Sequence, residues 1–412
     1  IVNGLFFCFL GIAGGYNTSP MMHRLQQRWR GEGGFGQILR LSLPLILSTS
    51  AHSLQLFVDR MFLTWHGSDS ISASVMAGMI HFSIVSLFYG TVTYANTFVA
   101  QYFGAGRKLR VGPSVWQAIW FSILGGTLML VCLPLSNALF GWAGHAPEIA
   151  RLEIIYFNIL CLSDIPLLVC GALSAFFTGR GKTWTVCWVN AAGTLVNIGL
   201  DYLLIFGHGG FPAWGIAGAA IATGIAQLTM MVIYVVIFFH PDHRREYATG
   251  SGIKLDWQLQ KRMLRFGGPN GLHFMLDVSA FGLFLLFIGR IDKLALAATG
   301  IAFQINTLAF MPMFGFGTAV STLVGQAQGA GKPDLAIRST WSATMLTFTY
   351  MTTIAIGYWF LPSIFLYPFA TKDNAEEFAQ FAPIAAILLR FVAFYCLLSL
   401  IHISEPTRLR RI

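Results

Sequence analysis

The stretches FVAQYFGAGR (residues 98–107) and LVGQAQGAGK (residues 323–332) carry the same pattern of Val, Gln, Gly-Ala-Gly and a basic residue, 225 positions apart. The same offset, without gaps, pairs further residues outside this motif: Arg40 with Arg265, Pro44 with Pro269, and Gly90 with Gly315. Arginine and proline are uncommon in apolar sequence, so this agreement indicates an internal duplication of the kind found in transporters.

The composition is that of a membrane protein. Of the 412 residues, 55% are hydrophobic and 10% are charged, whereas a soluble domain carries about 25% charged residues. Apolar runs long enough to cross a bilayer recur along the chain. They predict an all-α polytopic protein with ten spans, at 37–65, 70–102, 113–141, 151–178, 184–207, 213–239, 262–289, 294–327, 336–367 and 375–400.

The net charge of +9 is distributed in a way that indicates a membrane rather than a nucleic acid. Basic residues gather in alternate loops, and Arg290 and Lys293 depart mildly from this pattern. They include Arg24, Arg28 and Arg30 before the first span, and Arg107, Lys108 and Arg110 after the second. This positive-inside distribution predicts a multi-pass protein of the inner (plasma) membrane with a cytoplasmic N-terminus.

The duplication divides the chain into two lobes. We predict a first lobe of six helices at 37–240, a cytoplasmic linker at 241–261, and a second lobe of about four helices at 262–397. Six spans separate equivalent points, so the two repeats run in the same direction, and substrates of such transporters bind between the repeats.

The Gly-Ala-Gly triplets end a predicted span in both repeats. Glycine permits a sharp turn there, which makes Gly104, Gly106, Gly329 and Gly331 candidate structural residues, together with Pro44 and Pro269 as helix bends. The triplet is not a phosphate-binding loop, because Pro333 follows Lys332 where Ser or Thr is required.

Both ends of the sequence look foreign to the protein. Residues 1–20 are apolar without a basic start and are expected to be upstream read-through, whereas 21–36 form a plausible basic cytoplasmic N-terminus. The segment LSLIHISEPTRLRRI (398–412) resembles an in-frame translation of a sequencing-library adapter. It predicts a truncated second lobe, and the alternative is a short basic cytoplasmic tail.

Four carboxylates fall inside predicted spans: Asp59, Asp164, Asp201 and Asp277. Such residues usually serve ions or substrates, because charge in the bilayer interior is costly. Asn197 and Asp201 are four residues apart and share a helix face. They form either a compact ion site or a polar contact between helices, and Asp59 could instead form an interfacial salt bridge with Arg60.

The remaining polar residues of the spans allow alternative interpretations. His273 and Asp277 share a face and could relay protons or make a structural hydrogen bond. Asp164 precedes Pro166, a probable bend, while His52 and His81 are expected to be packed polar groups. The six cysteines show no C-x-x-C or His/Cys spacing, so neither a metal site nor a disulfide framework is predicted.

Several segments together resemble the multidrug and toxic compound extrusion (MATE) family over about residues 36–397. They are LRLSLPLILSTSAHSLQLFVD, FVAQYFGAGR, SAFFTGRGKT, VNIGLDYLLIFG, WGIAGAAIATGIAQ, RFGGPNGLHFMLD and LVGQAQGAGK. The resemblance implies twelve helices in two six-helix lobes around a cavity with alternating access. It also implies a monomeric exporter of cationic or amphipathic small molecules in exchange for H⁺ or Na⁺, without a cofactor or a nucleic-acid partner.

The resemblance also implies roles for single residues. Asp59, Asn197 and Asp201 match the ion or proton site of the first lobe, where Na⁺ could bind, and Asp277 takes the place of an acid that is often Glu. A further acid would fall just beyond FVAFYC (391–396). His273, Asp164, Gln101 and Gln326 are candidate cavity or helper residues.

Two other functions are weighed against the antiporter. A lipid-linked oligosaccharide flippase of the same superfamily would need basic residues in its cavity, but here acids outnumber bases within the spans. A membrane enzyme would need a clustered metal set or a nucleophile with its base, and the sequence shows neither, so we predict that the protein is not an enzyme.

Overall fold

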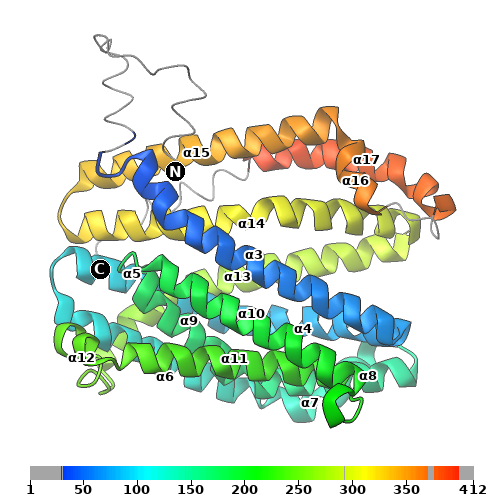
Figure 1. Cartoon of the computed structure of the whole chain (residues 1–412), viewed down its shortest axis with the longest axis horizontal. Coiled ribbons are helices and arrows are strands. Elements are labelled where there is room, and N and C mark those ends of the chain that lie inside the picture. Colours follow the sequence, from blue (N-terminus) through cyan, green and yellow to red (C-terminus); the bar gives the residue numbers. More distant parts are fainter. Residues whose placement is uncertain (1–28, 30, 144, 292, 370–374, 399–412) are drawn as a thin grey trace.

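The structure is a computed structural model that describes residues 29, 31–143, 145–291, 293–369 and 375–398. All regular secondary structure in these ranges is helical, in agreement with the predicted fold class. Figure 1 shows the long helices running in roughly one direction, with α4–α11 on one side of the molecule and α13–α17 on the other. Helix α3 (blue) crosses diagonally between the two groups.

Within the described residues the first lobe holds nine α-helices, and one or two residues separate the members of four successive pairs: α3 and α4, α4 and α5, α6 and α7, and α8 and α9. The nine helices are α3 (Phe35–His66), α4 (Ser68–Thr93), α5 (Ala95–Gly104), α6 (Val111–Met129), α7 (Cys132–Ala143), α8 (Pro147–Leu162), α9 (Asp164–Thr178), α10 (Thr183–Phe206) and α11 (Ile216–Phe238). Short 3-10 turns lie at Lys108–Arg110 and His208–Gly210.

The short helix α12 (Pro241–Tyr247) precedes the second lobe. That lobe contains α13 (Trp257–Ile291), α14 (Lys293–Gly329), α15 (Pro333–Phe360), α16 (Pro362–Leu366), a 3-10 turn at Tyr367–Phe369, and α17 (Ala375–Leu398). The predicted tail at 398–412 and the predicted read-through at 1–20 lie, apart from Leu398, outside the described residues.

Each of the ten predicted spans coincides with a helix or a pair of successive helices. Within the described residues, five helical segments can cross a membrane by length and composition, and seven can if two bent pairs each count as one. The bent pairs are α6 with α7, at 48°, and α8 with α9, at 44°. Pro166 lies in the first turn of α9, so the bend predicted there is confirmed, whereas α3 and α13 continue through Pro44 and Pro269.

The duplication is visible in how the lobes touch. Helix α3 packs on α14 of the other lobe, and α4 packs on α13, which is the equivalent pair. At these contacts a Cβ on Gly90 would lie 2.9 Å from the Cα of Gly271, and a Cβ on Gly315 would lie 2.9 Å from the backbone nitrogen of Ile46. Adding 225 to 46 and to 90 gives 271 and 315, so the two contacts are copies related by the sequence offset.

The linker between the lobes is fastened to the first lobe. The indole nitrogens of Trp116 and Trp120 on α6 donate hydrogen bonds to the carbonyl oxygens of Thr249 (2.8 Å) and Ile253 (2.9 Å). The buried Arg180 guanidinium lies 3.7 Å from the ring centroid of Phe176 and 4.5 Å from that of Tyr247, stacking geometry that favours arginine. The linker, including α12 and the segment that follows it, is therefore packed on the first lobe.

Candidate functional site

The predicted ion-site residues lie in the interior of the first lobe, where α3 packs along α10. Asp59 on α3 is 7% exposed, and Asn197 and Asp201 on α10 are fully buried. The spacing of four residues places Asn197 above Asp201 on one face of α10. The structure therefore brings Asp59 and Asp201 into electrostatic contact with each other and with the hydroxyl group of Tyr156.

The oxygens of this cluster are unsatisfied by the protein. Asp59 Oδ1, Asn197 Oδ1 and both carboxylate oxygens of Asp201 are buried without a hydrogen-bond partner among the described residues. The amide nitrogen of Asn197 donates to Thr223 Oγ1 at 3.4 Å, which fixes which end of the amide carries the unpaired oxygen. Burying an ionised carboxylate without a partner costs on the order of several kcal/mol of folding free energy. A bound proton or cation at this position would remove that cost.

The second predicted acid, Asp277, sits in a different environment. His273 Nδ1 lies 3.1 Å from Asp277 Oδ2, so the predicted one-turn pair forms, but the two side chains are 59% and 60% exposed. Subtracting 225 from 277 gives His52, and adding 225 to 59 gives Phe284. The second lobe thus carries no copy of the Asp59 site at the equivalent position.

Asp164 pairs with a residue that sequence spacing could not connect to it. His81 Nε2 on α4 lies 3.0 and 3.1 Å from the two carboxylate oxygens of Asp164, and both side chains are buried. The expectation that His81 is a packed polar group is confirmed. Asp164 is therefore a partner of His81 inside the first lobe, and its role as a cavity residue stays a prediction.

The two Gly-Ala-Gly motifs meet each other across the lobes, at the ends of α5 and α14. A Cβ on Gly104 would lie 2.0 Å from the carbonyl oxygen of Gln326, and a Cβ on Gly329 would lie 2.0 Å from that of Gln101. No side chain fits in this space, so glycine at both positions allows backbone to lie directly on backbone. We call this contact the motif seam, formed by Gln101, Gly104, Gln326 and Gly329.

The turn predicted after each triplet is confirmed. Gly106 and Gly331 have φ angles of 69° and 71°, which favour glycine. Arg107 N donates to the carbonyl oxygen of Tyr102, and Lys332 N donates to that of Ala327, both at 2.9 Å. These bonds are the six-to-one contacts that close a helix C-terminus, and they occur in both repeats.

Polar side chains reinforce the motif seam. Gln101 Nε2 donates to Gln328 Oε1 at 3.3 Å, and Gln326 Nε2 donates to the carbonyl oxygen of Gly179 at 2.8 Å. Deeper between the lobes, Asn96 Nδ2 donates to Thr322 Oγ1 at 3.2 Å. Gln101 and Gln326 therefore hold the lobes together, and their predicted contribution to a substrate cavity stays a prediction.

Comparison with known proteins agrees with this two-lobed arrangement. The MatE family model matches the chain twice, at residues 44–203 and 269–404. The chain belongs to the MatE family. The two matched segments begin at Pro44 and Pro269, which are separated by the offset of the duplication. The protein is accordingly a multi-pass membrane protein of a transporter family, and not an enzyme.

Curated relatives in the family include two proteins named "Probable multidrug resistance protein NorM". The one from Brucella suis biovar 1 (strain 1330) is 28% identical over 367 residues, which span 88% of this chain and 77% of the relative. The one from Rhizobium meliloti (strain 1021) is 30% identical over 298 residues, which span 72% of this chain and 64% of the relative.

Solved structures share the MatE fold. One, titled "Outward-facing conformation of a multidrug resistance MATE family transporter of the MOP superfamily", superposes with a TM-score of 0.82 at 20% identity, over 95% of this chain and 85% of that one. Another, a MOP superfamily transporter from Pyrococcus furiosus, is described as having reverse polarity of its binding pocket and matches equally well. These similarities establish only the fold of this MatE protein.

Proposed function

We propose that this MatE protein is a secondary antiporter that exports cationic or amphipathic compounds in exchange for H⁺ or Na⁺. The observation that carries the proposal is the cluster of unpaired, buried oxygens on Asp59, Asn197 and Asp201. Carboxylate and amide oxygens suit a hard cation, and either carboxylate can instead take up a proton. The names of the curated relatives support multidrug compounds as the exported class.

Helix α3 links this cluster to the other lobe. It carries Asp59 against α10, and through Ile46 and Thr49 it also contacts α14, where Thr49 Oγ1 lies 3.4 Å from the carbonyl oxygen of Met311. Uptake of a cation removes the repulsion between Asp59 and Asp201, so it favours tighter packing of α3 on α10. A shift of α3 changes its contact with α14, which gives the ion a means to favour one arrangement of the lobes over the other.

The motif seam supports a conformation that is closed on the cytoplasmic side. The basic residues Arg107 and Lys332 follow the two triplets directly, and the positive-inside rule assigns that end of the helices to the cytoplasm. Backbone contact at Gly104 and Gly329 leaves no passage there. Export requires that the lobes part at this seam to admit a substrate from the cytoplasm and close again before its release outside.

The flippase remains the second candidate, and the distribution of buried charge favours the antiporter. Among the side chains whose burial the structure describes, Arg180 is the only Lys or Arg that is buried. It stacks on Phe176 and Tyr247 at the linker. A pyrophosphate-bearing lipid would need such bases between the lobes. The buried acids are Asp59, Glu153, Asp164 and Asp201, and the unpaired oxygens of Asp59 and Asp201 suit a cation.

Efflux of ethidium from everted membrane vesicles, driven in turn by a proton gradient and by a sodium gradient, tests the proposed function. We expect Asp59→Asn to abolish gradient-driven efflux, because an amide can neither bind a proton nor neutralise a cation. Asp69→Asn is the matched control, since Asp69 is exposed in the first turn of α4. Efflux that is unchanged by Asp59→Asn, or driven by neither gradient in the unaltered chain, would contradict the proposal.

A further inference from the structure

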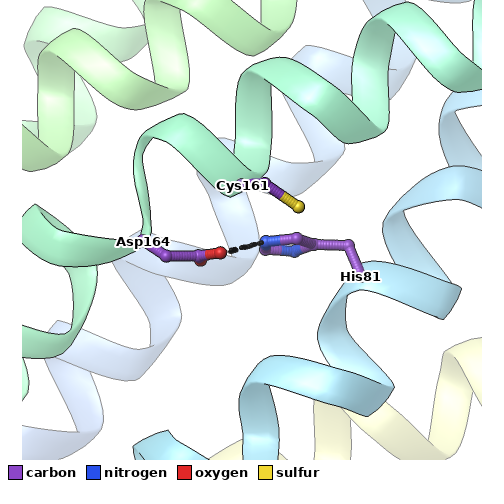
Figure 2. A group of neighbouring side chains, drawn as sticks. All are labelled: His81, Cys161 and Asp164. Carbon is purple, nitrogen blue, oxygen red and sulfur yellow. Dashed lines mark hydrogen bonds and ion pairs between the residues drawn. The ribbon is translucent and has the colours of Figure 1, made fainter. Parts of the chain in front are cut away.

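A second cluster of ligand-type side chains lies in the first lobe, apart from the Asp59 site. Figure 2 shows His81 on α4, Cys161 near the end of α8 and Asp164 at the start of α9 pointing toward one another. Their potential ligand atoms all lie within 4.8 Å of one another, and none of the three residues is more than 7% exposed. The side chains come from three different helices and meet at one point.

The position of the cluster in the fold is specific. Cys161 and Asp164 flank the break between α8 and α9, a helix pair that is bent by 44°. A group that joined the three side chains would tie this bend to α4 through His81.

The types of ligand define the chemical class of a binder. One thiol, one imidazole and one carboxylate are ligands that zinc takes up, with a water molecule in the fourth position of a tetrahedron. Thiolate sulfur favours zinc and other thiophilic cations over Na⁺, Mg²⁺ and Ca²⁺, which separates this cluster from the oxygen-only site at Asp59.

The spacing already suits such a cation. In a tetrahedral zinc site, nitrogen and oxygen ligands about 2.0 Å from the metal are about 3.3 Å apart. The distances of 3.0 and 3.1 Å from His81 Nε2 to the carboxylate oxygens of Asp164 are close to that value.

The charge of the cluster also allows a metal in an apolar lobe. Binding Zn²⁺ requires that the Cys161 thiol release its proton, so the two positive charges of the metal balance the thiolate and the Asp164 carboxylate. The net charge of the occupied site is then zero.

We propose that His81, Cys161 and Asp164 form a structural site for a thiophilic divalent cation of the zinc class. The cation holds the bent pair of α8 and α9 against α4. This site opposes the sequence-based expectation of no metal site, which rested on the absence of closely spaced cysteines. The proposal does not depend on the transport function.

Titration of the purified, metal-free full chain with Co²⁺ tests the site directly, with an affinity tag that contains no histidine. Cobalt bound to thiolates in tetrahedral geometry gives a sulfur-to-metal charge-transfer band and visible d–d bands. We expect these bands to saturate at about one Co²⁺ per chain and to disappear when Zn²⁺ is added. A wild-type chain without a charge-transfer band at saturating Co²⁺ would overturn the proposal, whether or not any variant folds.

Variants identify the ligands. Cys161→Ser should abolish the charge-transfer band, whereas Cys187→Ser should leave it unchanged, because Cys187 is buried on α10 outside the cluster. Zinc should raise the midpoint of thermal unfolding of the wild type and of Cys187→Ser, but not that of Cys161→Ser. An unchanged band in Cys161→Ser would overturn the proposed ligand set.

Discussion

Gly104 and Gly329 touch the opposite lobe in the same way. Gly104 lies against the backbone carbonyl of Gln326, and Gly329 lies against that of Gln101. In each repeat the glutamine precedes the glycine by three residues. The two positions differ by 225, the offset that relates the repeats throughout the sequence. The duplicated motif therefore packs against its own copy, and this contact explains why the chain contains it twice.

Substitution of a seam glycine should force the lobes apart. In Gly329→Ala the new Cβ would lie 2.0 Å from the carbonyl oxygen of Gln101, and backbone cannot move aside as a flexible side chain can. We expect about 1–3 kcal/mol of destabilisation of the closed seam, and a longer distance between spin labels on α5 and α14. Gly300→Ala on the same helix is the control, because nothing lies within 4 Å of its Cβ. Equal label distances in both variants would refute the seam.

The buried polar contact at Asn96 should contribute to holding the lobes together. Asn96 Oδ1 accepts a hydrogen bond from Thr178 Oγ1 at 2.7 Å within the first lobe, while its amide nitrogen reaches Thr322 of the second lobe. Thr322→Val removes the partner in the second lobe without changing its shape. We expect the free energy of unfolding in detergent to fall by about 1–3 kcal/mol.

The control for this contact is Thr307→Val on the same helix, whose hydroxyl is exposed and bonds only to the carbonyl oxygen of Phe303. Unfolding by denaturant, followed by tryptophan fluorescence, measures both variants. If Thr322→Val unfolds at the same denaturant concentration as the control, the Asn96 contact does not stabilise the lobe interface.

The stacked arginine should control the order of the linker. Arg180→Lys keeps the positive charge but removes the planar group that lies over Phe176 and Tyr247. We expect trypsin to cleave the variant faster at Lys254 in inside-out vesicles, because α12 is then held less firmly to α9 and the segment that follows it can move away more easily. Arg151→Lys, an exposed position on α8, should be cleaved at the rate of the unaltered chain. Equal cleavage of the two variants would argue against the stack.

Much of the fold is predictable because membrane helices carry their own signal. The ten apolar segments and the offset between Pro44 and Pro269 define the helices, the lobes and their relative direction. The break between α6 and α7 is missing from the prediction, although the sequence marks it. Pro134 is the third residue of α7, as Pro166 is the third residue of α9, so the same signal precedes both bends.

The candidate sites also contain some contacts that the sequence predicts and others that it does not. The pair of Asn197 and Asp201 is predictable from helix periodicity, but the approach of Asp59 to them was inferred from family resemblance, because it joins two separate helices. The contact between His81 and Asp164 spans 83 positions, and no spacing or repeat connects the two residues along the chain. Side-chain clusters that depend on which faces of distant helices meet become visible only in three dimensions.

Substrate-driven cation counterflow in proteoliposomes tests the central claim most directly, with one dye for pH and another for Na⁺. The account predicts that adding an exported cation such as ethidium to one side drives H⁺ or Na⁺ the opposite way. It further predicts that Asp201→Asn abolishes this counterflow, because the substitution removes a buried carboxylate that has no hydrogen-bond partner in the described part of the chain. Counterflow in Asp201→Asn equal to that of the unaltered chain, or ethidium movement without any cation counterflow, would contradict it.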